Sequence, residues 1–157
     1  MRPVRRAIFP GQTAASPRTL REAIQAAAES IEDESLDLLW PDNALTPNQA
    51  RSVLASLTLC YARQIYKSTD AAIVVARDLS FPCLYAGKLP DAPTLRRFRA
   101  VNTDALRRCL TAALHFLVEQ KVFSGFVTRA DLPQLAEEAG RRIIVAMFVD
   151  SLKLDGE

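Results

Sequence analysis

The chain has 157 residues, of which 49% are apolar and 24% charged, and its formal net charge is +2. This composition is typical of one globular domain that buries its own core, and it excludes fibrous and disordered chains. Because the net charge is small, a case for nucleic-acid binding depends on how the charges are distributed.

The cysteines and the hydropathy pattern indicate a cytoplasmic protein. Cys60, Cys83 and Cys109 form no CxxC pair, so we expect reduced, buried thiols and neither a zinc site nor a disulfide framework. No window of about 18 apolar residues occurs, so we expect no membrane span. The single histidine, His115, has no other metal-ligand residue type beside it, and we expect no metal, cofactor or small-molecule substrate.

The first sixteen residues predict an extended basic arm. Prolines and a glycine break any regular element there, and Arg5 and Arg6 could enter a DNA groove, as such arms do. Ser16 is a good N-cap and Pro17 suits a first turn, so the first helix is expected over about 17–30. The next stretch, ESIEDESLDLLWPDN, contains acids and no base, and should face away from DNA or cover a basic surface of its own domain.

Two further helices follow in the pattern. Thr46, Pro47 and Gln49 form a capping box with proline at the first helical position, which predicts a helix start. Apolar residues then recur at spacings of three and four, at Leu54, Leu57, Tyr61 and Ile65. Ser68 or Thr69 caps a short helix to about Asp78, and an irregular stretch then runs to Gly87.

Residues 91–122 are helical in pattern, with a break or kink expected near Asn102. Asp91 caps the start, and Phe98 is expected to pack inward. If the helix were continuous, four arginines would form an exposed cationic face opposite the apolar one. These arginines are Arg96, Arg97, Arg107 and Arg108.

Arg99 does not follow that division, because it falls within the apolar arc. Either the helix breaks and its phase is reset, or Arg99 is partly buried against a carboxylate such as Asp91 or Asp78. We therefore expect a structural role for Arg99.

The C-terminal stretch is open to two interpretations. As a helix, it has Leu135, Ala139, Ile143, Ala146 and Met147 on one side and Glu137, Glu138, Arg141 and Arg142 on the other. As a buried strand, RIIVAMFVDS is a β-branched run that ends in an acid. We favour the helix, because an acid-rich stretch leads into it and no partner strand is evident. The predicted fold is therefore all-α, a compact bundle of about five to seven helices over residues 17–157.

Residues 62–102 resemble the helical N-terminal domain of insertion-sequence transposases of the DDE class. That family carries a PD-small-Ser/Thr-Thr-x-x-x-Phe-Arg core after a helix of this kind. Here the core is matched by Pro90, Asp91, Thr94, Phe98 and Arg99, while Pro93 stands where the family has Ser or Thr. The resemblance extends more loosely over about residues 45–122.

The resemblance implies DNA binding without catalysis. In the family, the helical region precedes an RNase H-like domain whose three carboxylates hold two metals. Only FVDSLKLDGE follows the helices in this sequence, so we expect no catalytic domain here. Asp150 could correspond to the first of the family's acids, but we expect a helical aspartate. The implied function is a stand-alone domain that binds DNA, such as element ends, through the four arginines and the arm.

A second function class remains open. The same helices could form a protein-interaction or dimerisation module that binds a second copy or a transposase subunit, with the arginines meeting an acidic surface. A decayed remnant without a specific partner is a third alternative.

Overall fold

The computed structural model describes residues 17–39, 45–77, 90–120 and 132–156. All regular structure in these ranges is helical, so the predicted all-α class is confirmed. The basic arm, Cys83, Asp78 and the irregular stretch up to Gly87 lie outside the described residues. The elements are, in chain order, α2 (Leu20–Glu29), the 3-10 turn η1 (Asp33–Ser35), α3 (Pro47–Ala62), α4 (Ser68–Arg77), α5 (Ala92–Val101), α6 (Thr103–Glu119) and α7 (Leu132–Gly156).

Helix α2 begins later than the sequence predicts. Its N-cap is Thr19, whose hydroxyl accepts a hydrogen bond from the backbone N–H of Glu22 at 3.1 Å. The Glu22 carboxylate in turn accepts from the backbone N–H of Arg18 at 2.7 Å. This reciprocal pair satisfies two N–H groups at the helix start, and so it outweighs the Ser16–Pro17 signal.

Helix α3 begins as predicted and forms the centre of the bundle. The Thr46 hydroxyl accepts from Gln49 N–H, and the Gln49 side chain accepts from Thr46 N–H, which completes the capping box. Residues 53–61 are buried on every side of the helix. Such a helix must be surrounded by others, since no polar face remains for solvent.

The end of α3 differs from the predicted periodicity. The helix ends at Ala62, and Gln64 adopts a positive φ of 63°. Ile65 N–H then bonds the Cys60 carbonyl at 2.8 Å and Gln64 N–H bonds the Tyr61 carbonyl at 3.1 Å, which is a Schellman motif. Ile65 therefore lies beyond the helix, half-buried against the core.

The predicted break at Asn102 is confirmed, because this residue separates α5 from α6. Its side chain makes no capping bond to α6. Instead, the amide donates to the Asp37 carbonyl at 3.0 Å and accepts from the Asp37 N–H at 2.8 Å. The expected cap thus binds the acid-rich segment to the α5–α6 junction.

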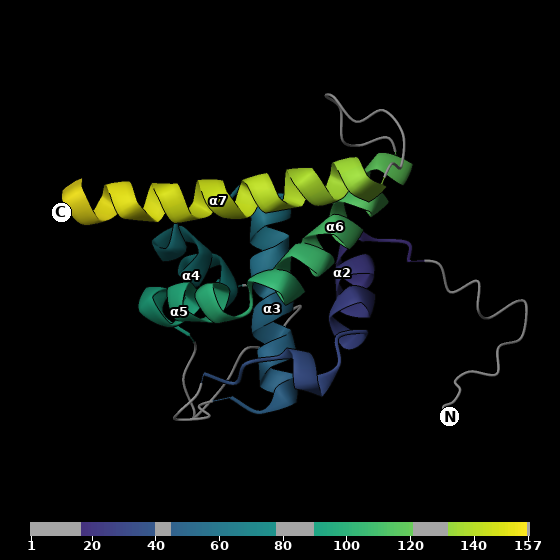
Figure 1. The fold of residues 1–157 in the computed structure, drawn as a ribbon, viewed down its shortest axis with the longest axis horizontal. Helices are drawn as coiled ribbons and strands as arrows, with labels where there is room; N and C mark the ends of the chain where they lie inside the picture. Colours follow the sequence, from purple (N-terminus) through teal and green to yellow (C-terminus); the bar gives the residue numbers. More distant parts are fainter. Residues whose placement is uncertain (1–16, 40–44, 78–89, 121–131, 157) are drawn as a thin grey trace, which may run out of the picture.

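The C-terminal stretch is the helix α7, and the strand alternative is wrong. Figure 1 shows α7 lying across one end of α3, with α6 under its N-terminal half and α4 and α5 under its C-terminal half. Every α-helix contributes to one core, and α7 contributes Leu135, Ala139, Ile143 and Ala146. The helix therefore closes the bundle.

Two properties of the described residues bear on compartment and reactivity. None of the helices in the described ranges combines the length and the low polarity that a membrane span requires.

Cys60 and Cys109 are buried thiols, as predicted. Burial raises the pKa of the Cys109 thiol to about 12, so this thiol is protonated at neutral pH and unreactive.

Candidate interaction surfaces

Arg99 lies in a buried polar network beneath α7. Only 6% of the residue is exposed. Its guanidinium lies 2.9 Å from a carboxylate oxygen of Asp150 and donates to the Tyr61 hydroxyl at 3.1 Å. The expected structural role and carboxylate partner are therefore present, but the partner is Asp150 rather than Asp91.

Asp150 links three helices and is not placed for metal chemistry. Its carboxylate accepts from the backbone N–H of Ser68 at 2.9 Å and from the Ser68 hydroxyl at 2.6 Å. Ser68 is the first residue of α4, so α7 supplies an anion to the positive end of another helix. Burial alone would raise the pKa of Asp150, but the bonds from Ser68 and the charge of Arg99 outweigh it, and the pKa lies below its usual value.

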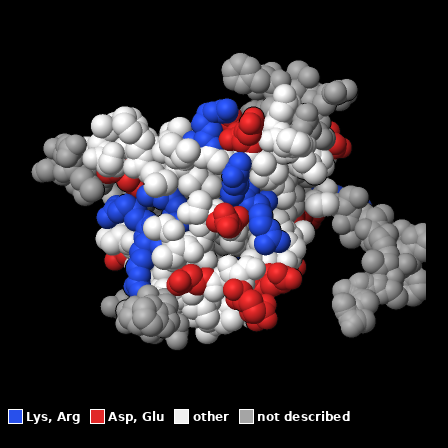
Figure 2. Space-filling model, in the orientation of Figure 1, with Lys and Arg blue, Asp and Glu red and all other residues white. Residues whose placement is uncertain are grey.

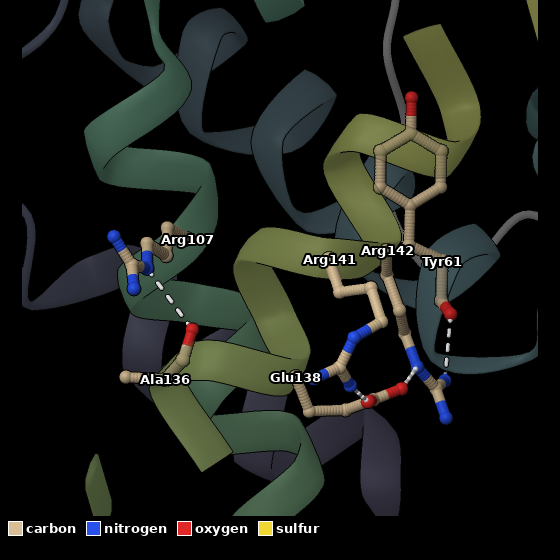
Figure 3. A network of polar contacts seen from close by, with 6 residues as sticks. All are labelled: Tyr61, Arg107, Ala136, Glu138, Arg141 and Arg142. Carbon is tan, nitrogen blue, oxygen red and sulfur yellow. Dashed lines mark hydrogen bonds and ion pairs between the residues drawn. The ribbon is translucent and has the colours of Figure 1, made fainter. Parts of the chain in front are cut away.

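Arg142 makes the corresponding contact at the end of α3. Its guanidinium donates to the Tyr61 carbonyl at 2.9 Å (Figure 3). It also donates to the Ala62 carbonyl at 3.1 Å. It also bonds Glu138 at 2.8 Å. A cation is favourable at a helix C-terminus, where the last carbonyls have no helical partner. The sequence pattern placed Arg142 on the polar side, but only 3% of it is exposed.

Arg107 joins α6 to α7 rather than standing free. Its Nε donates to the Ala136 carbonyl at 3.0 Å (Figure 3). A Cβ at Gly140 would lie 3.4 Å from the guanidinium carbon of Arg107. The small residue thus leaves room for the arginine to lie against α7.

The other two arginines of α5, Arg96 and Arg97, also interact within the chain. Arg97 donates to the Leu39 carbonyl at 2.9 Å, at the end of the acid-rich segment. Hydrogen bonds from Thr94, assisted by the charge of Arg96, hold the pKa of Asp91 below its usual value. Asp91 caps α5 with a 3.0 Å bond to Thr94 N–H, and Phe98 is fully buried, both as expected.

The four arginines do not form one face of one helix. The break at Asn102 assigns Arg96 and Arg97 to α5, and Arg107 and Arg108 to α6. Figure 2 shows basic and acidic side chains interspersed on the face drawn. The single cationic face calculated for a continuous helix is therefore wrong, although Arg97, Arg107 and Arg108 are exposed. Arg5 and Arg6 lie outside the described residues.

The acid-rich segment covers basic groups of its own domain, as one of its predicted alternatives states. Arg51 of α3 donates to Asp33 at 2.5 Å and to the Ile31 carbonyl at 2.5 Å. Together with the Arg97 contact to Leu39, this ties the segment to α3 and α5. The segment is thus already partnered inside the chain.

A groove of about 660 Å³ lies between α2 and α6. Four alanines and Phe116 line it together with the polar residues His115, Glu119 and Gln120. The imidazole lies 3.8 Å from the Glu119 carboxylate. Among the described residues, no three His, Cys, Asp or Glu side chains are grouped to hold a metal ion.

The outward side of α7 is a surface that the sequence interpretation missed. Four large apolar side chains are more than half exposed there: Ile144 (65%), Met147 (51%), Phe148 (60%) and Leu152 (54%). Ala146 and Met147 had both been expected on the inward stripe, but only Ala146 is buried, and the prediction for Met147 is wrong. The signal was present in the sequence, since Ile144, Phe148 and Leu152 recur every four residues.

Comparisons with protein families, with curated proteins and with solved structures found no match for this chain. The resemblance of residues 62–102 to transposase N-terminal domains therefore stays a prediction.

Proposed function

We propose that this chain is a helical protein-interaction module that binds its partner through the outward side of the C-terminal half of α7. The observation that supports this proposal is the stripe formed by Ile144, Met147, Phe148 and Leu152, hereafter the α7 stripe. Contiguous exposed apolar patches on soluble proteins are typically interaction sites. We place the module in the cytoplasm, in keeping with the buried thiols of Cys60 and Cys109.

The rest of the helix is suited to presenting such a surface. Contacts at Ala136, Arg142 and Asp150 hold α7 to four other helices along its length. A rigid helix pays little conformational entropy when a partner binds, because its backbone is ordered beforehand. Helix faces with anchors at spacings of three and four are a recurrent recognition mode.

In-cell photocross-linking tests this function. A benzoylphenylalanine at position 148 should cross-link to a polypeptide, because the position lies in the middle of the α7 stripe. The matched control is position 101 at the end of α5, where Val101 is 47% exposed. Absence of any polypeptide adduct from position 148, or equal labelling from position 101, would contradict the proposal.

A second candidate is DNA binding by a stand-alone transposase N-terminal-like domain that does not catalyse strand transfer. The observation that favours it is that Arg97 and Arg107 are exposed, yet each guanidinium is already held by a backbone carbonyl. An arginine so held loses less rotamer freedom when it meets a phosphate, and it retains further donors.

Fluorescence anisotropy tests this candidate, with duplex DNA taken from the ends that flank the gene of this chain. If the four arginines each meet one phosphate, affinity should fall roughly 150-fold between 50 and 200 mM salt. The Arg96→Glu/Arg97→Glu variant should leave the slope of the two remaining contacts, roughly a 12-fold fall over the same range. Arg63→Glu/Arg77→Glu, with the same change in charge, should keep the full slope. If both variants lose the same amount of DNA affinity, the loss would be due to net charge alone, and the arginine site would be rejected.

A further inference from the structure

We propose that the partner of the α7 stripe is a second copy of this chain, bound antiparallel about a twofold axis that passes close to Phe148. This inference rests on the proposed function of the stripe and adds the identity and geometry of its partner. Its carrying observation is that the exposed residues Ile144 and Leu152 lie four positions before and four positions after the exposed Phe148.

The symmetry follows from helix geometry. At 100° per residue, the four side chains occupy an arc of about 140°, opposite the buried residues Ala139 and Ala146. Ile144 and Leu152 each lie four residues from Phe148. A twofold axis at Phe148 therefore places Ile144 against Leu152 of the second copy, and Phe148 against its own equivalent. An isologous interface requires a surface that is complementary to itself in this way.

The charges of α7 permit the contact. Between Arg142 and Leu152 the helix contains two charged residues, Arg142 and Asp150, which are 3% and 4% exposed and point inward to partners of their own chain. The outward arc between them is uncharged, and Figure 2 shows mostly uncharged side chains over this part of the molecule. A second copy would thus bury no charge and meet no like-charge repulsion there.

The charge of Arg141 favours the antiparallel arrangement. Arg141 is exposed beside the stripe, and parallel helices would bring two such arginines together. In the antiparallel register the two arginines instead lie at opposite ends of the contact. Antiparallel helices also oppose their macrodipoles favourably.

The area is suitable for the centre of a dimer interface. Large apolar side chains bury on the order of 100 Å² each, so the stripe offers on the order of 400 Å² per copy. That is about half of the roughly 800 Å² that each partner contributes to a standard interface. An apolar centre with a polar rim of similar extent is the usual anatomy. A membrane-surface helix would instead be expected to carry lysines and arginines along its flanks.

Sedimentation equilibrium of the full purified chain is the first test. We expect a dimer at micromolar concentration and at least a 100-fold weaker association for Phe148→Glu. Val101→Glu, a matched exposed apolar site, should remain within twofold of the parent chain. Circular dichroism should show all three proteins folded. A parent chain that stays monomeric up to about 100 μM, or a dimer indifferent to Phe148→Glu, would overturn the inference.

Cysteine trapping tests the orientation while it retains Phe148. In a Cys83→Ser background, the Ile144→Cys and Leu152→Cys proteins should form a disulfide with each other when mixed and mildly oxidised. Neither should cross-link efficiently with itself, because equivalent positions lie far apart in antiparallel helices. Strong self-cross-linking of Ile144→Cys would indicate parallel pairing and overturn the stated geometry.

The two proposals fail in different ways. If the purified chain is monomeric while position 148 cross-links to another polypeptide in cells, the interaction function stands and the second copy is rejected. Binding of the monomer to anionic phospholipid vesicles would likewise reject the second copy. If position 148 yields no polypeptide adduct and the chain stays monomeric, both proposals are rejected.

Discussion

Over residues 142–152 of α7, charged residues lie on the buried side and large apolar residues on the exposed side, which is unusual for a helix at a protein surface. The inward side carries Arg142 and Asp150, both nearly fully buried, whereas the outward side carries Ile144, Phe148 and Leu152, all more than half exposed. Buried charges are costly unless they are paired, and here both are. The comparison shows that the inward charges have a structural task, whereas the outward apolar side chains have none within the described part of the chain.

The inward task is to complete other helices. Arg142 donates to the last carbonyls of α3, and Asp150 accepts from the first N–H of α4. The C-terminal end of α3 and the N-terminal end of α4 both meet α7. A cation is favourable at the first and an anion at the second. A charged pair eight residues apart on one helix meets both needs. We therefore expect substitutions on the two sides to have different consequences.

The largest effect is expected for Asp150→Ala. The change leaves the Arg99 guanidinium buried without its carboxylate and removes two bonds to Ser68, so the free energy of unfolding should fall by about 3–5 kcal/mol. Urea unfolding measures it. Ser151→Ala, one position along on the exposed side, is the matched control and should change stability by under about 0.5 kcal/mol. If the free energy of unfolding fell by less than about 1 kcal/mol for Asp150→Ala, the buried network of Asp150, Arg99 and Ser68 would not stabilise the fold as stated.

Arg142→Ala should cost less, about 1.5–3 kcal/mol. It removes charge-assisted bonds to the Tyr61 and Ala62 carbonyls and to Glu138, but leaves Glu138 paired with Arg141. Arg141→Ala removes a neighbouring arginine whose side chain is 60% exposed, and should cost at most about 0.5 kcal/mol. Thermal unfolding of both variants compares them directly. Equal losses of stability in the two variants would mean that the contact of Arg142 with the end of α3 does not stabilise the fold.

Acidification should act on the same inward side with a smaller effect, because a protonated Asp150 can still hydrogen-bond Ser68. The folded pKa of Asp150 lies below its unfolded value of about 3.9. The stability due to its ionisation is therefore complete above about pH 4 and is lost as the pH falls through the folded pKa. Unfolding free energies between pH 6 and 2 should fall less steeply for Asp150→Asn than for the parent chain. Identical slopes would contradict this assignment.

The smallest effect on the fold is expected on the outward side. Phe148→Gln removes a side chain that is 60% exposed, so the free energy of unfolding at low protein concentration should change by under about 0.5 kcal/mol. Urea unfolding at about 1 μM measures this value. A loss above about 2 kcal/mol would show that Phe148 supports the monomer, and would remove the contrast between the two sides.

Much of the fold was predictable because its signals are local. Thr46 and Gln49 start α3 through contacts within one turn, and Asp91 starts α5 in the same way. The predicted start of α2 was wrong because the Thr19 cap is completed by Glu22, three residues further along. The surfaces were predicted less well, since the arginine face assumed a continuous helix and the α7 stripe was hidden in a run that is apolar on both sides.

The sequence by itself determined the helical class, the starts of α3 and α5 and the burial of Phe98, because periodicity and capping act over a few residues. Only the tertiary structure decided that Arg99 is buried and which carboxylate it meets, why Arg142 is buried, and which side of α7 faces water. The contacts of Asp150 join residues separated by 51 and 82 positions in the chain. The sequence indicates where a helix ends, and therefore which backbone N–H and C=O groups need a partner. Which side chain bonds to those groups depends on how the helices pack.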